Sequence, residues 1–338
     1  MDENRNSSTT PIGQAGAWMA EGQRVALATV VETWGSSPCP VGSQMAISEK
    51  ARFAGSVSGG CIETSVVSEA IEAIKDKKPV LLRYGVTDEQ GHAAGLTCGG
   101  NIGVFVEPLD AMLLMQYQGR KPFVRAVGLD SGAWAVLRQD KTEGALSMNE
   151  AIRAGLRAAG QDGECCVIRE GAEPVFIHPV RPAFRLIVIG AVRIAQSLAP
   201  MAVEAGFEVT IVDPRRAFAT PERFPGLSLV CEWPDKALPV LGVDSGTAVV
   251  TLTHDAKPDD MALIYALRSP ALYVGALGGR KSHAKRIARL KEMGLTDIEI
   301  ARIRAPVGLD IGAETPAEIA LSIIAEIVAA KNGKSFRP

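Results

Sequence analysis

The second half of the chain alternates short apolar runs with segments of helical pattern, and this alternation constrains the fold more than any other feature. The expected strands cover residues 186–189, 208–213, 227–231, 247–251 and 272–275, and the expected helices cover 191–205, 257–268 and 281–293. Short apolar strands joined by helices are typical of a parallel sheet covered on both faces. The sequence therefore predicts an α/β fold in this half, with a Rossmann-like, doubly wound parallel sheet.

The end of the chain carries the signals of one more helix. Thr315 and Glu318 match the Thr-x-x-Glu pattern of a capping box, in which each side chain bonds the other residue's backbone N–H. Pro316 suits the first helical turn, and Gly333 suits the residue that follows the last turn. We expect a helix between these boundaries.

The first half shows a different pattern and is expected to form a separate, mixed α+β domain. Its expected strands cover 24–32, 44–48, 80–84 and 101–107, and apolar residues at helical spacing from Ile62 to Ile74 predict a helix. A stretch with proline and arginine, residues 178–184, is typical of a linker. We therefore expect domains at 1–180 and 184–338, with the polar segment 1–11 disordered.

Charge and hydropathy limit the partners. The net charge is −2, so no global positive field attracts nucleic acid. No apolar run approaches the roughly 18 to 20 residues of a membrane-spanning helix. We expect neither nucleic acid nor a membrane as a partner.

The cysteines indicate the cellular compartment. None of the 6 cysteines forms a CxxC pair, and the polar start of the chain lacks an apolar signal segment. These features predict free thiols in the reducing cytoplasm. A tetrahedral zinc site is not expected, because only 4 histidines exist and none lies near a cysteine pair.

The turn after residues 186–189 is similar to the first turn of a dinucleotide-binding unit. The template G-x-G-x-x-G/A is matched by Gly190 and Ala195, whereas Val192 replaces the glycine that lets a pyrophosphate approach. Asp213 closes the next strand, where an acidic side chain accepts from a ribose hydroxyl. Val192 disfavours NAD(P), and the alternative is that Gly190 serves only the tight turn.

Two further loops follow expected strands, where ligands of parallel sheets bind. His254 follows the strand 247–251 and is either a proton carrier or a loop histidine bonded to backbone. Gly278, Arg280 and Lys281 follow the next strand. A glycine turn, a helix N-terminus and two cations could hold a phosphate, or the basic run is a solvated helix face.

Two glycine–cysteine turns mark the first half. Cys61 follows Gly59 and Gly60 and opens a helix, where converging N–H groups and the helix dipole favour a thiolate. Thiolates attack sulfur donors and bind soft metals such as molybdenum. Cys98 is followed by Gly99 and Gly100 before an expected strand. The alternative for both cysteines is a small buried apolar side chain; the remaining cysteines, Cys39, Cys165, Cys166 and Cys231, are expected to be structural.

Six motifs together resemble the XdhC/CoxI family, the maturation factors of xanthine and carbon monoxide dehydrogenases. They are GSVSGGCIE (55–63), TCGG (97–100), VIGAVRIAQ (188–196), VVTLTHD (249–255), GALGGRKSH (275–283) and PVGLDIGAETPAEIA (306–320). The likeness spans residues 18 to 330. Val192, in place of a second glycine, and the SGGC sequence resemble a CoxI-like subgroup.

The resemblance implies a chaperone of the molybdenum cofactor rather than a catalyst. Such proteins bind molybdopterin or its dinucleotide form, promote its sulfuration by a cysteine desulfurase and deliver it to an apo-molybdoenzyme. Family members also self-associate, which implies a homodimer. Our hypothesis assigns Cys61 and Cys98 to the metal or sulfur end of the cofactor. The residues expected to form the anion cradle are Ser56, Ser58, Gly59, Gly60, Gly99 and Gly100.

Two other functions remain open at this point. One is an NAD(P)-dependent oxidoreductase with His254 as the acid or base, which predicts sensitivity to loss of Asp213. The other is an interaction scaffold in which neither half binds a ligand.

Overall fold

The chain folds into two compact units, Ser7–Pro182 and Ala183–Pro338. The computed structural model describes residues 10–34, 39–60, 62–85, 101–117, 121–139, 141–253 and 255–334. Residues 1–9 of the segment expected to be disordered lie outside this part. The expectation was wrong for its last two residues, because Thr10 caps a helix that begins at Pro11.

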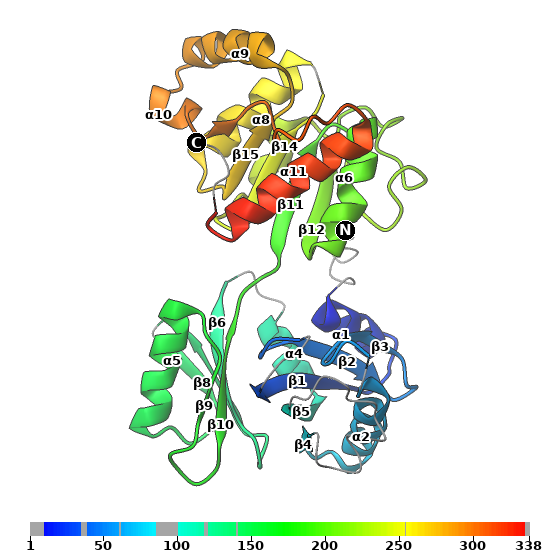
Figure 1. Ribbon diagram of the computed structural model, residues 1–338, viewed down its shortest axis with the longest axis vertical. Coiled ribbons are helices and arrows are strands. Elements are labelled where there is room, and N and C mark those ends of the chain that lie inside the picture. Colours follow the sequence, from blue (N-terminus) through cyan, green and yellow to red (C-terminus); the bar gives the residue numbers. More distant parts are fainter. Residues whose placement is uncertain are drawn as a thin grey trace. The chain divides into compact units, whose positions relative to one another are not determined.

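The amino-terminal unit contains two antiparallel sheets (Figure 1). The first has the order β3-β2-β1-β5-β4, and the second has the order β8-β7-β6-β10-β9. The strands of the first are β1 (Val25–Trp34), β2 (Gln44–Ser48), β3 (Phe53–Gly55), β4 (Val80–Tyr84) and β5 (Asn101–Leu109). The strands of the second are β6 (Phe123–Gly128), β7 (Trp134–Arg138), β8 (Lys141–Gly144), β9 (Cys166–Ile168) and β10 (Val175–Val180).

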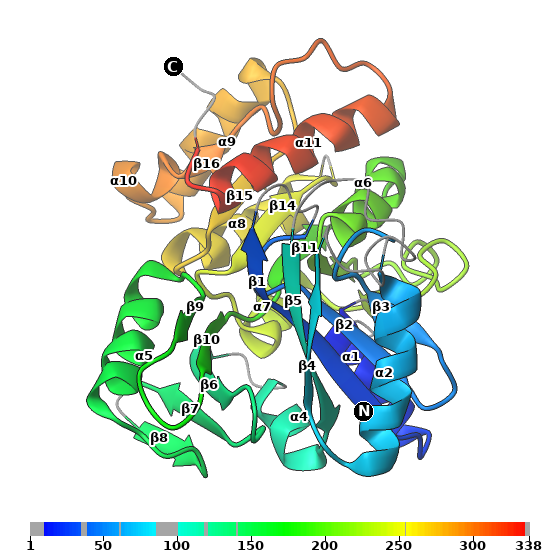
Figure 2. The same cartoon turned by 60° about the horizontal axis from the view of Figure 1, so that its bottom comes forward.

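Four described helices accompany these sheets: α1 (Pro11–Ala20), α2 (Glu63–Asp76), α4 (Ala111–Tyr117) and α5 (Glu150–Asp162). The helix α2 lies along one face of the first sheet (Figure 2). Its residues Val66, Ala70 and Ile74 recur at helical spacing and pack into a buried cluster with side chains of β1, β2 and β5. This packing fixes the start of α2, and with it the glycine turn that precedes the helix.

The carboxy-terminal unit contains a six-stranded parallel sheet of order β13-β12-β11-β14-β15-β16. Its strands are β11 (Phe184–Ile189), β12 (Phe207–Val212), β13 (Ser228–Val230), β14 (Thr247–Thr251), β15 (Tyr273–Ala276) and β16 (Ile303–Arg304). Its helices are α6 (Arg193–Glu204), α7 (Pro234–Leu241), α8 (Ala256–Arg268), α9 (Arg280–Glu292), α10 (Asp297–Ile300) and α11 (Pro316–Lys331). This strand order is that of a doubly wound dinucleotide-binding fold, which confirms the predicted fold class.

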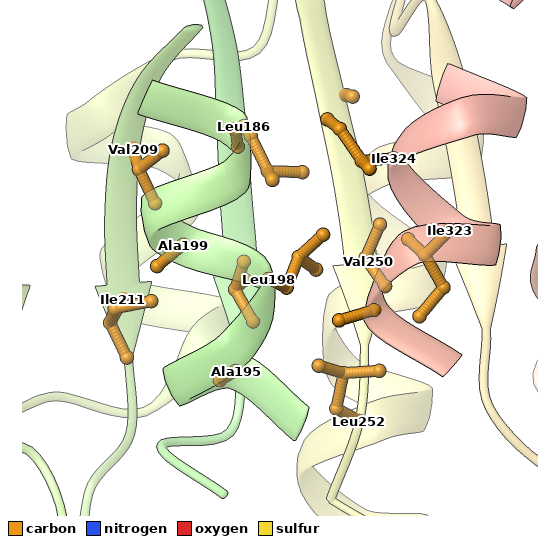
Figure 3. Close-up of a cluster of buried hydrophobic side chains, with 14 of the residues drawn as sticks. Leu186, Ala195, Leu198, Ala199, Val209, Ile211, Val250, Leu252, Ile323 and Ile324 are labelled. Atoms are coloured by element: carbon orange, nitrogen blue, oxygen red, sulfur yellow. The ribbon is translucent and has the colours of Figure 1, made fainter. Parts of the chain in front are cut away.

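Helices cover both faces of the parallel sheet because side chains alternate along each strand. Leu186 and Val188 of β11 belong to a buried cluster with residues of α6 and α11; Figure 3 shows Leu186 beside α6, and Ile323 of α11 beside Val250 of β14. Ile187 and Ile189 face the opposite cluster, which contains residues of α7 and α8. Burying one such side chain contributes about 1.5 to 3 kcal/mol, so this double coverage stabilises the fold.

The sequence-based boundaries are close but incomplete. The capping box of α11 forms as predicted, with Thr315 as N-cap. The expected linker was too long, because residues 178–180 belong to β10 and β11 begins at Phe184. The sequence did not predict α7, α10 or β16. Within the described ranges, none of the helices has both the length and the apolar character needed to cross a membrane.

A buried ion pair joins the two sheets of the amino-terminal unit. Arg125 of β6 donates from Nη1 and Nη2 to the two carboxylate oxygens of Glu107 on β5, each at 2.6 Å. The side chains are only 3% and 5% exposed. Such a pair fixes the geometry of the sheets more than it adds stability, because both charges lose their hydration.

Replacing Arg125 by Met leaves a buried, unpaired carboxylate, and we expect the free energy of unfolding to fall by about 3 to 5 kcal/mol. The double variant Arg125→Met/Glu107→Leu removes both charges and should recover most of this loss. Urea denaturation measures both. The control, Arg157→Met, breaks the exposed pair with Glu150 and should cost less than about 0.5 kcal/mol. Equal losses in the single and double variants would contradict this account.

Candidate functional site

The glycine turn between β3 and α2 is folded around the carboxylate of Glu63. This carboxylate accepts hydrogen bonds from the hydroxyl of Ser56 (2.6 Å), the hydroxyl of Ser58, and the backbone N–H groups of Ser58 and Gly60, each at 2.9 Å. The N–H of Val57 also points to it at 3.3 Å. The turn therefore contains an anion, and that anion is supplied by the chain itself.

These bonds keep Glu63 ionised. Burial alone would raise the pKa of Glu63, but the hydrogen bonds from Ser56 and Ser58 outweigh it and lower the pKa to about 2. The side chain is therefore a carboxylate at neutral pH. Its charge also lies in the first turn of α2, where the helix dipole favours it.

The same network fixes the backbone on both sides of Cys61. The N–H of Gly60 donates to Oε2 of Glu63 at 2.9 Å, and the N–H of Ile62 donates to Oγ of Ser58 at 3.1 Å. Gly59 and Gly60 have positive φ angles of 76° and 119°, which favour glycine. Cys61 itself lies outside the described residues.

Four of the six predicted cradle residues, Ser56, Ser58, Gly59 and Gly60, lie in one turn, but most of their donors face inward. The hydroxyls of Ser56 and Ser58 and the N–H of Gly60 bind Glu63, and the N–H of Gly59 binds Oγ of Ser56. A cofactor phosphate would have to compete with Glu63 for these groups. The tip at Gly59 and Gly60 is exposed. Cys98, Gly99 and Gly100 lie outside the described residues, so their predicted roles stay predictions.

Sequence reasoning missed one residue of this turn, Glu63, and one residue that contacts it, Cys39. Glu63 was overlooked because an acidic residue in the first turn of a helix is common. The pattern that could have identified its role is the preceding Ser-x-Ser-Gly-Gly stretch, whose hydroxyl and N–H donors need an acceptor. Cys39, expected to be only structural, has its Sγ 3.8 Å from Oγ of Ser56. By contrast, burial raises the pKa of the Cys165 thiol to about 11, with a smaller contribution from Cys166.

A cavity of about 480 Å³ lies elsewhere in the same unit. Ile74 and Lys77, at the end of α2, line it together with Gln23, Glu107 and Trp134. Eleven residues of helix separate Glu63 from Ile74, which is about 17 Å along the axis. The cavity is therefore distinct from the glycine turn at the start of α2.

The described residues contain no group of three or more His, Cys, Asp or Glu side chains arranged to hold a metal ion. Both cysteines predicted as metal ligands fall outside those residues. The metal assignment therefore stays a prediction.

In the carboxy-terminal unit, Gly190 makes the tight turn after β11. Its φ is +107°, and a Cβ there would lie 2.7 Å from Cγ2 of Thr253. Its N–H donates to the carbonyl of Val212 at 2.8 Å. Gly190 is thus required by the turn and by the close approach of the loop after β14. The adjacent His254 lies outside the described residues.

Asp213 bonds the same turn. Its Oδ2 accepts from the N–H of Ala191 and from Nη2 of Arg215, both at 2.8 Å, and its Oδ1 accepts from N and Nε of Arg215 at 3.0 and 2.9 Å. Burial would raise the pKa of Asp213, but the bonds from Arg215 and Ala191 lower it. Four bonds fill the roughly four acceptor positions of a carboxylate. A ribose hydroxyl could bind Asp213 only if Arg215 released it.

The comparisons with known proteins agree with this architecture. Residues 186–327 match the family model of the XdhC Rossmann domain, and residues 18–85 match that of the XdhC and CoxI family. The chain belongs to the XdhC and CoxI family, as its motifs predicted.

The similarity to individual relatives extends over nearly the whole chain. The molybdenum cofactor insertion chaperone PaoD of Escherichia coli (strain K12) is 28% identical over 93% of this chain and 85% of its own length. A protein of Bacillus subtilis (strain 168) that is named a probable xanthine dehydrogenase component is 29% identical over 92% of this chain and 94% of its own. A crystal structure of a xanthine dehydrogenase from Bacillus halodurans has the same fold, with a TM-score of 0.72, 24% identity and 97% coverage of both chains.

Replacing Glu63 by Gln should weaken the turn at neutral pH. Because the folded pKa of about 2 lies below the ordinary value of 4.5, the carboxylate stabilises the fold above pH 4.5 and loses this effect as the pH falls toward 2. We expect the variant to be about 2 kcal/mol less stable at pH 7, with the difference shrinking below pH 4.5. Denaturant unfolding across this pH range measures it, with the exposed Glu69→Gln as control. A loss independent of pH would contradict the role of the charge.

Proposed function

We propose that this protein binds the molybdenum cofactor and delivers it to an apo-molybdoenzyme of the xanthine or carbon monoxide dehydrogenase type. The protein acts as a chaperone, and the cofactor is its cargo. It also assists the sulfuration of the cofactor by a cysteine desulfurase.

One observation carries the proposal: PaoD, which is named a molybdenum cofactor insertion chaperone, is similar to this chain across both units. The geometry of the first unit supports it. The matched region 18–85 contains the turn that Glu63 organises, with Cys61 between Gly60 and Ile62.

The chemistry of that position suits the cargo. The dipole of α2 favours a negative charge at its N-terminus, where the carboxylate of Glu63 lies. Thiolates bind soft metals and attack sulfur donors. We assign Cys61, with Cys98, to the metal or sulfur end of the cofactor, and the exposed tip at Gly59 and Gly60 to its phosphate.

We assign the protein to the cytoplasm as a homodimer, in line with its unpaired thiols and its family. Within the described residues, Cys39, Cys165, Cys166 and Cys231 form no disulfide bond. A reducing compartment keeps such thiols free.

The alternative function, an NAD(P)-dependent oxidoreductase, has less support. Val192 is the N-cap of α6 at the position where the template has glycine. Asp213 already has four hydrogen bonds within the chain. Both features oppose nicotinamide dinucleotide binding at the turn after β11.

The thiol assignment predicts the behaviour of two variants. Cys61→Ala and Cys98→Ala, purified from a host that makes molybdopterin, should each retain less than about a tenth of the wild-type cofactor, because a lost ligand typically costs at least tenfold in affinity. Client activity regained from apo-enzyme should fall in parallel. Mass spectrometry and metal analysis measure the first effect, and an activity assay measures the second.

Cys166→Ala is the matched control, because Cys166 is an exposed cysteine of the same unit. It should behave as wild type. Full cofactor retention and full client activation by both Cys61→Ala and Cys98→Ala would refute the assignment. Glu63→Gln should fall between the control and the cysteine variants, since it disturbs the turn but keeps both thiols.

A further inference from the structure

The turn between β15 and α9 differs from the other glycine turns described above, because no carboxylate caps the N-terminus of the helix that follows it. The N-cap of α9 is Gly279, which provides no side-chain cap, and the first turn contains no acidic residue. The first turn contains Arg280 and Lys281 instead, both exposed. The leading N–H groups of a helix lack intrahelical partners and carry partial positive charge. Two cations at this end are unfavourable unless an anion is present.

A buried arginine lies against the inner side of this turn. Arg286 is 5% exposed, and its Nη2 donates to the carbonyl of Leu277 at 2.7 Å. The same nitrogen lies 3.8 Å from the position of a Cβ on Gly278. Its Nε and Nη1 are buried and have no hydrogen-bond partner among the residues that the structure describes. The carboxylate of Asp259 is 3.9 Å away and accepts from Thr253 at 2.7 Å.

The outer side of the turn is open. Gly278 has a φ of +121°, and a Cβ on Gly279 would meet nothing within 4 Å. The turn follows the carboxyl end of β15 in a parallel sheet, which is the edge where such folds bind ligands. Backbone N–H groups of a glycine turn and a helix N-terminus are suitable donors for phosphate oxygens.

We infer that the β15–α9 turn binds the diphosphate group of a nucleotide, through the N-terminal N–H groups of α9 together with Arg280 and Lys281, over the buried charge of Arg286. Two flexible cations and the helix dipole match the charge of a diphosphate better than that of a single ester phosphate. The nucleotide is either free or the nucleotide end of a dinucleotide cofactor. The inference does not depend on the role of the cysteines.

The equivalent turn after β11 explains why the ligand binds here instead. There the carboxylate of Asp213 bonds the N–H of Ala191 and pairs with Arg215. At the β15–α9 turn the residue below the turn is an arginine rather than an aspartate. Arg286 donates to the carbonyl of Leu277 and pairs with Asp259, so no carboxylate bonds the N–H groups of this turn among the residues that the structure describes.

The test uses the full-length protein and isothermal titration with inorganic pyrophosphate, ADP, CDP, GDP and adenosine. We expect pyrophosphate and the three diphosphates to bind and adenosine to bind at least tenfold more weakly. Equal binding of the three diphosphates, or a preference for ADP, indicates a free nucleotide. A preference for CDP or GDP indicates the nucleotide end of a dinucleotide cofactor.

Variants separate binding from folding. Gly279→Asp places a carboxylate at the N-cap, where it caps the helix and occupies the site. It should raise the melting temperature without ligand, yet bind pyrophosphate at least tenfold more weakly. Lys281→Glu should weaken binding by a similar factor. Lys285→Glu, one turn further along the exposed side of α9, is the matched control and should stay within twofold of wild type.

Two results would overturn the inference. One is wild-type protein that binds neither pyrophosphate nor any diphosphate. The other is unchanged affinity in both Gly279→Asp and Lys281→Glu. Because the thiols of the first unit are intact in these variants, neither result bears on the proposed chaperone function.

Discussion

The carboxylate of Glu63 is the interaction on which the candidate site depends. A glycine-rich turn directs several N–H groups and hydroxyls toward one point, and such a concentration of donors needs a negative charge. Glu63 supplies this charge from the first turn of the helix that follows. The turn is thereby ordered without a ligand.

The same principle organises the second unit. Asp213 occupies the turn after β11 as Glu63 occupies the turn before α2. In both cases an internal carboxylate takes donors that a sequence pattern would assign to a ligand. The β15–α9 turn has Arg286 beneath it and cations above it. We infer that this turn binds an anion from outside the chain.

These arrangements separate the tasks of the two units. In the first unit, Glu63 bonds the glycine turn before α2. The second unit keeps the architecture of a dinucleotide-binding fold, but Asp213 bonds its glycine turn after β11, and Val192 replaces the second glycine of the template. These features agree with the proposed chaperone function, which needs no hydride chemistry.

Local patterns along the chain were sufficient to predict the parallel sheet, the capped helix at Thr315 and the family, because periodicity, capping and turn motifs are local signals. They also located the turns at Gly59 and Gly190. The side chains that bind these turns, Glu63 and Asp213, could be identified only from the tertiary structure. Whether a backbone N–H meets Glu63 or Asp213, or is left for a ligand, depends on side-chain positions within a few ångströms. A sequence motif indicates which hydrogen-bond donors a turn contains. Which acceptor binds those donors is decided by the tertiary structure, because it determines which side chain lies within hydrogen-bonding distance.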